Sequence, residues 1–249
     1  MSTPGADHDW QPIDCPVCAE HCFTHLFDKG GEPFVRCRSC GLTLINPRPP
    51  PSTVRATYDA AYSAGYTVKA AKKSTRAARR VRRLAREFGG HGRWLDVGCS
   101  AGFVVKAAAD AGFEAHGVDI EPAAIDYGRR QLGLTGLACG LLDEQRYPDS
   151  HFNIITAYDV IEHVPDLNPF VHELARLLTP GGLIEIGTPD IGHWRVPRPL
   201  ECWHEFKPSE HLYYFNRATL SRLLARHGLQ VVRVRWTLKP GLKMVVAHR

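Results

Sequence analysis

The sequence contains no apolar segment long enough to cross a membrane. A membrane-spanning helix needs about 20 consecutive apolar residues, and no run of that length occurs in the 249 residues. Residues 1–11 are polar and lack the charged and then apolar layout of a secretion signal. We therefore expect a cytoplasmic protein that is not inserted into a membrane.

Charge of one sign is not in large excess either. The 31 Lys and Arg residues only slightly outnumber the 26 Asp and Glu residues, which gives a formal net charge of +5. Nine of the basic residues lie within residues 69–86, a segment that contains no acid. A charge this modest and this local is weak support for binding to nucleic acid.

The basic segment has the periodicity of an amphipathic helix. Its apolar residues recur at helical spacing: Ala77, Val81, Leu84, Ala85 and Phe88. We expect this apolar face to pack on a sheet and the basic face to be solvated. Recognition of an anionic substrate or of RNA is the alternative use of the basic face.

Two of the three glycines of a dinucleotide-binding fingerprint are missing from the glycine-rich turn that follows residues 94–97. The fingerprint needs glycine at the first, third and sixth positions of the turn, which are Gly98, Ser100 and Phe103 here. A cofactor such as NAD or FAD is therefore disfavoured.

The same stretch nevertheless predicts a nucleoside site. Residues 94–97 have the apolar composition of a covered strand, and residues 103–111 have that of a helix. Gly98 and Gly102 stand where the backbone must turn sharply and approach a ligand closely. A strand, a glycine turn and a helix N-terminus form the usual nucleoside-binding site of doubly wound α/β sheets.

Acidic and apolar residues follow the ends of the next two expected strands. Asp119 ends a strand over residues 113–118, where a carboxylate can accept hydrogen bonds from both hydroxyls of a ribose. Ile120 follows it directly. Leu141 comes after a short strand over residues 137–140 and could flank an adenine ring. We expect Asp119, Ile120 and Leu141 to contact the cofactor.

A fourth strand, over residues 152–157, leads into candidate catalytic residues. Asp159, Glu162 and His163 follow its end, and the carboxyl ends of parallel strands are where such sheets bind ligands. We assign Asp159 to the cofactor site. The helix after this strand is expected to continue to Gly181 and Gly182.

Four of the eight cysteines have the spacing of a zinc site. Cys15 and Cys18 form one Cys-x2-Cys pair, and Cys37 and Cys40 form a second after 18 intervening residues. Each short pair can direct two thiolates at one tetrahedral ion. The predicted zinc ion is structural, since the ribbon around it is too small to build its own core. His21, Cys22 and His25 are alternative ligands with less suitable spacing.

Two aromatic residues precede the basic helix. Tyr58 and Tyr62 are four residues apart and would share one face of a helix. Tyr62 is a candidate for the mouth of the cofactor pocket, and ordinary packing is the alternative.

The glycine turn and the fourth strand resemble one known family. Asp96 and the sequence Asp-Val-Gly-Cys-Ser-Ala-Gly resemble the first motif of class I S-adenosylmethionine-dependent methyltransferases. The sequence Asp-Val-Ile-Glu-His-Val resembles the fourth-strand signature of methyltransferases of the ubiquinone-biosynthesis type. The ribbon is similar to that of zinc-carrying sugar C-methyltransferases.

This resemblance implies an α/β fold with a doubly wound seven-stranded sheet whose last strand is antiparallel. It implies S-adenosylmethionine as the cofactor, contacted also by Asp96, and methyl transfer by in-line displacement. A Glu-His pair, Glu210 and His211, resembles a catalytic step of the sugar enzymes, and His163 is the other candidate base. The residues leave open which of these removes the proton.

The expected domains are a zinc ribbon with its Pro-rich linker over residues 1–51 and a methyltransferase domain over residues 52–249, with a helical lead-in over residues 52–90. The expected partner is a small-molecule acceptor, such as a natural product, a sugar or a quinone-like compound, methylated at carbon or oxygen. An RNA-directed methyltransferase or a zinc-dependent RNA-binding protein is the alternative. The sequence does not indicate the acceptor atom or the oligomeric state.

Overall fold

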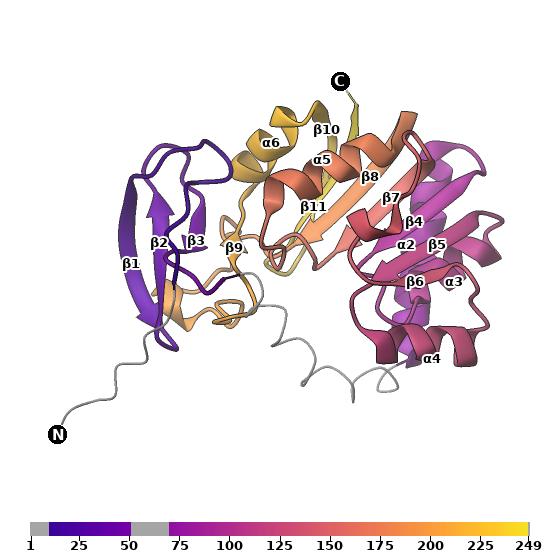
Figure 1. Cartoon of the computed structure of the whole chain (residues 1–249), viewed down its shortest axis with the longest axis horizontal. Coiled ribbons are helices and arrows are strands. Elements are labelled where there is room, and N and C mark those ends of the chain that lie inside the picture. The colour runs from indigo at the N-terminus through magenta and orange to yellow at the C-terminus, as the bar shows by residue number, and fades with distance from the viewer. Residues whose placement is uncertain (1–9, 51–69, 249) are drawn as a thin grey trace.

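The computed structural model describes residues 10–50 and 70–248, which form two β-sheets with helices on the larger one (Figure 1). The larger sheet has seven strands in the order β10-β11-β8-β7-β4-β5-β6. Its strands are β4 (Arg93–Val97), β5 (Glu114–Asp119), β6 (Leu137–Cys139), β7 (Phe152–Tyr158), β8 (Leu178–Thr188), β10 (Leu229–Arg235) and β11 (Leu242–His248).

The sheet has the expected topology. β4 pairs in parallel with both β5 and β7, and β8 pairs in parallel with β7. The last strand, β11, runs antiparallel to β8 and to β10, which confirms the predicted antiparallel strand. The chain runs outward from β4 through β5 to β6 and then returns to the other side of β4 as β7. This reversal places a ligand-binding crevice at the carboxyl ends of β4 and β7.

Five helices lie among the described residues: α2 (Ala70–Phe88), α3 (Phe103–Asp110), α4 (Pro122–Leu132), α5 (Leu167–Leu177) and α6 (Arg217–Arg226). α2 and α3 pack on one face of the sheet, against residues such as Trp94 and Ile154. α5 and α6 pack on the other face, against Leu95 and Ile155. Because successive strand residues point to opposite faces, each central strand supplies both cores. No helix in these ranges has the length and apolar composition of a membrane span.

The basic helix α2 behaves as its periodicity predicts. Ala77, Val81 and Leu84 are buried against the sheet. The exposed residues of the helix include Lys72, Lys73, Arg76, Arg79, Arg82 and Arg86, as expected for a solvated basic face.

Helix α5 ends earlier than its glycine signal suggests. The predicted end lay near Gly181, but the helix stops at Leu177 and β8 begins at the next residue. Leu178 is fully buried and pairs with Phe152 of β7. Pairing with the neighbouring strand therefore overrides the local glycine signal.

The smaller sheet has the order β1-β2-β3-β9, with β1 (Phe23–Lys29), β2 (Glu32–Cys37), β3 (Thr43–Ile45) and β9 (Tyr213–Tyr214). The predicted hairpin within the zinc ribbon is confirmed, because Val35 pairs with Leu44. The last strand of this sheet, β9, comes from far along the chain, since its Tyr213 pairs with Leu44 of β3. The domain boundary after residue 51 stays a prediction, but segments on both sides of it share one sheet.

Side-chain contacts also join the ribbon to the rest of the molecule. The Arg48 guanidinium donates hydrogen bonds to the Tyr213 hydroxyl and, over 2.6 Å, to the Pro165 carbonyl oxygen. The Glu32 carboxylate accepts hydrogen bonds from the backbone N–H and the hydroxyl of Ser209. Both anchors hold the ribbon against the segment around β9.

The segment over residues 190–212 is irregular apart from one short 3-10 turn (Leu200–Cys202). Its aromatic residues are nevertheless buried. Trp203 and Phe206 form a small core with Phe34 of the ribbon and with Tyr214. The aromatic rings of this segment therefore hold the ribbon in place.

Candidate functional site

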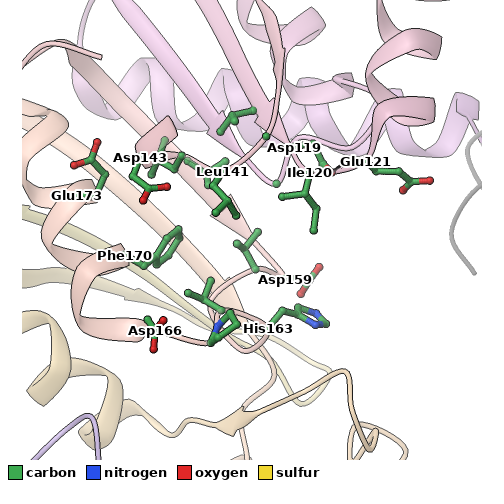
Figure 2. A pocket seen from close by; sticks show the side chains of 18 of the residues that line it. Asp119, Ile120, Glu121, Leu141, Asp143, Asp159, His163, Asp166, Phe170 and Glu173 are labelled. Carbon is green, nitrogen blue, oxygen red and sulfur yellow. Dashed lines mark hydrogen bonds between the residues drawn. The ribbon is translucent and has the colours of Figure 1, made fainter. Parts of the chain in front are cut away.

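A cavity of about 620 Å³ opens at the carboxyl ends of the central parallel strands, where the strand order reverses. Figure 2 shows Ile120 and Leu141 on one side of it and Asp159 and His163 across from them. The residues that line it follow β4, β5, β6 and β7 or lie on α5: Val97, Gly98, Ser100, Val118, Asp119, Ile120, Glu121, Gly140, Leu141, Leu142, Asp143, Tyr158, Asp159, Val160, His163, Val164, Pro165, Asp166, Pro169, Phe170 and Glu173.

The turn after β4 needs glycine at the cavity wall. Gly98 has a φ of +67°, and a Cβ there would come within 2.3 Å of Cγ2 of Val160. Its backbone N–H donates to the Val118 carbonyl oxygen at 2.9 Å, which ties the turn to β5. A side chain at this position would be strained and would collide with the opposite wall.

Asp119 holds the turn and lines the cavity at the same time. One carboxylate oxygen accepts a hydrogen bond from the Ser100 backbone N–H at 2.7 Å, and the other accepts from Glu121 N–H at 3.0 Å. Burial raises the pKa of Asp119, and these backbone donors oppose that rise. Each carboxylate oxygen can accept more than one hydrogen bond, so Asp119 can still bind two hydroxyl groups of a ligand.

Apolar residues flank Asp119 in the cavity. Ile120 is 41% exposed, although it is a large apolar residue, and it lines the cavity together with Leu141. Exposed apolar side chains beside a carboxylate suit a ligand with a flat ring and a sugar.

Two of the predicted cofactor residues do not line this cavity. Gly102 is the N-cap of α3, and its backbone faces Leu134 and Leu137. Asp96 is 4% exposed and accepts a hydrogen bond from the Thr156 hydroxyl at 2.6 Å. Burial raises the pKa of Asp96 to about 7, against the effects of Thr156 and Arg80. Direct contact of either residue with a ligand stays a prediction, and Tyr58 and Tyr62 lie outside the described residues.

Two of the three candidate catalytic side chains, those of His163 and His211, meet beside the cavity. His163 lines it, and Nδ1 of His163 lies 2.8 Å from the Glu210 carbonyl oxygen. The rings of His163 and His211 are 4.6 Å apart between centroids. Burial lowers the pKa of His163 to about 4 and that of His211 to about 3, so both rings are neutral near pH 7. The sequence separates these residues by almost 50 positions, and only the fold brings them together.

The Glu210 side chain takes no part in this contact. It is 53% exposed and lies 3.9 Å from Lys207. The carboxylate beside the two imidazoles belongs to Glu162, which is 1% exposed and accepts a hydrogen bond from the Thr188 hydroxyl at 2.9 Å. Burial, with a smaller effect of the charge of Asp159, raises the pKa of Glu162 to about 8.

No sequence motif predicted the cavity wall that α5 supplies. Phe170 and Glu173 line the cavity one helical turn apart, on a helix that also buries an apolar face in the core. A cavity wall and a core face have the same periodicity, so only the position of α5 above the crevice distinguishes them.

Part of the basic helix points inward. The Arg83 guanidinium donates to the Glu185 carboxylate at 2.7 Å, and Arg235 binds the same carboxylate. The Arg80 guanidinium lies 3.9 Å from the centroid of the Tyr158 ring, which lines the cavity. These arginines therefore contact side chains of β7 and β8.

The four predicted metal ligands converge. The sulfur atoms of Cys15 and Cys40 are 3.4 Å apart, those of Cys18 and Cys37 are 3.5 Å apart, and all four lie within 4.8 Å of one another. Sulfur atoms bound to one tetrahedral zinc ion at about 2.3 Å have separations of about 3.8 Å, so the four thiolates fit one zinc ion. None of them lines the cavity, and Cys22 is exposed outside the cluster.

A family model described as a methyltransferase domain matches residues 70–234. The chain is 28% identical over 156 residues to a probable S-adenosylmethionine-dependent methyltransferase of Mycolicibacterium smegmatis, covering 55% of this chain and 61% of that protein. It is 35% identical over 108 residues to a ubiquinone biosynthesis O-methyltransferase of Alkalilimnicola ehrlichii, covering 39% and 41%. The matches thus span about two fifths to three fifths of the length of these relatives.

Solved structures share the fold. A 1,6-didemethyltoxoflavin-N1-methyltransferase of Burkholderia thailandensis, solved with its substrate and S-adenosylhomocysteine, has a TM-score of 0.63 and 16% identity, covering 90% of this chain and 98% of that one. A magnesium protoporphyrin IX methyltransferase of Synechocystis has a TM-score of 0.60 and 15% identity, covering 80% and 100%. At these identities the likeness concerns the fold.

Removal of one cysteine ligand should loosen β9 as well as the ribbon. In Cys37→Ser we expect loss of the thiolate-to-metal charge-transfer band of the cobalt-substituted protein and faster hydrogen exchange at residues 212–215, because β9 pairs with β3. Cys22→Ser is the matched control and should keep both properties. Unchanged exchange at residues 212–215 in Cys37→Ser would show that the ion does not hold this segment.

The buried Asp96 should make stability fall as pH rises. Its pKa of about 7 in the folded state exceeds the value of an unfolded Asp, so the folded chain binds the proton more tightly and loses this advantage as pH rises through 7. The stability of the wild type relative to Asp96→Asn should fall by about 2 kcal/mol between about pH 5.5 and 8. Urea unfolding of both proteins across this range measures the difference, and parallel pH profiles would contradict it.

Proposed function

The chain belongs to the methyltransferase domain family, and from this premise we propose that it transfers the methyl group of S-adenosylmethionine to a small-molecule acceptor. The observation that carries the proposal is the cavity at the strand reversal, where a glycine turn and the Asp119 carboxylate meet. Relatives named as S-adenosylmethionine-dependent methyltransferases support the same cofactor.

Different residues of the cavity suit different parts of this cofactor. Asp119 would accept the two ribose hydroxyl hydrogens, and Ile120 and Leu141 would flank the adenine ring. Asp159 lies at the opposite side of the cavity, with His163 beside it (Figure 2). The cofactor supplies a methyl group on a positively charged sulfur. Gly98 leaves room for the backbone to approach the ligand closely.

The residues at the His163 end would orient the acceptor and help it to lose a proton. In-line displacement needs the acceptor atom aligned with the methyl group, which the cavity walls can provide. His163 and His211 are buried, neutral imidazoles, the form in which a histidine can take up a proton. The Glu210 backbone carbonyl orients His163, so residue 210 contributes through its main chain.

The acceptor class follows from the cavity walls. Val160, Val164 and Phe170 are apolar, whereas Asp166 and Glu173 add carboxylates at the same wall. An apolar ring system with a few polar groups suits such a wall better than a phosphate backbone does. We therefore infer a natural product, a sugar or a quinone-like compound, methylated at oxygen or carbon.

Nothing in the described ranges specifically supports the RNA alternative. RNA binding would need one continuous basic surface across the ribbon and α2, but Arg83 and Arg80 of that helix are engaged inside the fold. A four-thiolate zinc site requires reduced cysteines, which supports the cytoplasmic location expected from the sequence.

Cofactor binding should depend on Asp119. We expect Asp119→Asn to bind S-adenosylhomocysteine about 10 to 100-fold more weakly, because one charged acceptor for the ribose hydroxyls is lost. Asp126→Asn is the matched control, since Asp126 lies on α4 and pairs with Arg130 at the surface. Calorimetric titration measures both affinities. A wild-type protein without affinity for S-adenosylhomocysteine would refute the proposed function.

The acceptor can be identified with isotope-labelled cofactor. Incubation of the protein with methyl-labelled S-adenosylmethionine and a panel of phenolic, quinone-like and sugar compounds should yield a labelled product that mass spectrometry detects. With that acceptor, His163→Asn and His211→Asn should each lower kcat by about 10² to 10⁴-fold while the affinity for S-adenosylhomocysteine changes little. His204→Asn, a change at an exposed histidine, should keep the wild-type rate. Equal rates in all three variants would exclude a role of the imidazole pair.

A further inference from the structure

A second group of metal-ligand side chains lies beside the cavity, apart from the four cysteines. Glu162, His163 and His211 each offer one ligand atom, and these atoms all lie within 4.8 Å of one another. Glu162 and His163 follow β7, whereas His211 directly precedes the segment that forms β9. The cluster therefore depends on the position of the segment that leads into β9, whose Leu212 N–H donates to the Glu162 carbonyl oxygen at 2.8 Å.

The hydrogen bonds of the two histidines determine which ring nitrogen can bind a metal ion. Nδ1 of His163 lies 2.8 Å from the Glu210 carbonyl oxygen, and Nδ1 of His211 lies 2.9 Å from the Glu205 carbonyl oxygen. A carbonyl oxygen can only accept, so each Nδ1 carries the proton. In the neutral ring the lone pair is then on Nε2. Histidine ligands of metal ions are held in this way, with the other ring nitrogen bonded to a carbonyl.

The carboxylate of the cluster lacks a donor. Glu162 is 1% exposed, and its Oε2 accepts from the Thr188 hydroxyl. Its Oε1 is buried and receives no hydrogen bond from any part of the chain that the structure describes. A buried carboxylate oxygen without a partner is destabilising. Three atoms that can each ligate a metal ion thus converge within 4.8 Å of one another.

We propose that Glu162, His163 and His211 bind a divalent metal ion. Two imidazole nitrogens and one carboxylate oxygen suit Mn²⁺, Fe²⁺, Co²⁺ or Zn²⁺ and leave coordination positions for other ligands. The four cysteines present only thiolates and select Zn²⁺. The two sites therefore differ in ligand chemistry and can be distinguished experimentally.

The position of the ion suggests a role in methyl transfer, and this role rests on the proposed methyltransferase function. His163 lines the cavity, so an ion bound there can contact an acceptor oxygen. The ion would lower the pKa of an acceptor hydroxyl group, whose proton would pass to water. The acceptor oxygen would then form a bond to the methyl carbon as the bond from that carbon to sulfur breaks, and S-adenosylhomocysteine would leave. With their Nε2 atoms bound to the ion, the two imidazoles would promote proton loss through the ion instead of taking up the proton themselves.

Mn²⁺ alone tests the site, because thiolates bind this hard ion weakly. We expect zinc-loaded wild-type protein to bind one Mn²⁺ per chain in an electron paramagnetic resonance titration, without cofactor or acceptor. Glu162→Gln and His211→Asn should weaken this binding at least tenfold, and the exposed His204→Asn should not. A titration without a saturable site in the wild type, or with equal affinity in Glu162→Gln, would overturn the proposal.

Thermal unfolding separates loss of the ion from loss of the fold. Without added metal, Glu162→Gln should unfold at or above the wild-type temperature, because the change removes a buried carboxylate that lacks a donor. With Mn²⁺ the wild type should gain thermal stability and Glu162→Gln should not. An equal gain in both proteins would count against the site. This assay uses no S-adenosylhomocysteine, so its failure would leave the Asp119 binding test of the proposed function unaffected.

Discussion

The position of β4 between β5 and β7 is the constraint on which the rest of the structure depends. Both neighbours pair with β4 in parallel, so the three strands end at the same edge of the sheet. The turn after β4, the carboxylate of Asp119 and the residues after β7 are therefore brought to one cavity. The hydrogen bond from the Ser100 backbone N–H to the Asp119 carboxylate then joins the turn after β4 to the end of β5.

The ribbon is part of this arrangement although its cysteines lie outside the cavity. β3 pairs with β9, and the Leu212 N–H next to β9 donates to the Glu162 carbonyl oxygen at 2.8 Å. Arg48 at the end of the ribbon bonds to the Pro165 carbonyl in the cavity wall. A zinc ion in the ribbon would thus stabilise the segment that places His211 beside His163, which gives a structural ion an indirect effect on the chemistry of the cavity.

Buried ionisable groups gather around this edge of the sheet. Burial raises the pKa of Asp96 and of Glu162 and lowers the pKa of His163 and of His211. Each of these groups is most stable uncharged in the folded chain, unless a ligand or ion supplies opposite charge. Perturbed groups of this kind are common where a protein binds a charged cofactor.

Local pattern in the sequence was sufficient for much of the fold and for the cofactor side of the cavity. Chemistry within a few residues was enough to predict the strand over residues 94–97, the turn at Gly98 and the role of the acid at position 119. It was also enough to predict that Cys15 and Cys18 act on the same metal ion. The cysteine cluster is confirmed, and so are the seven-stranded sheet and its antiparallel last strand, which the family resemblance implied.

Only the tertiary structure decided which distant residues meet. The sequence placed Glu210 with His211 as neighbours, yet the carboxylate that lies with the two imidazoles is that of Glu162. Leu178 pairs with Phe152 of β7 instead of extending α5, and Tyr213 pairs with Leu44 in the smaller sheet. The physical reason is the same in each case: local sequence determines backbone preference and side-chain chemistry, whereas burial and strand pairing between distant segments determine which side chains share a site.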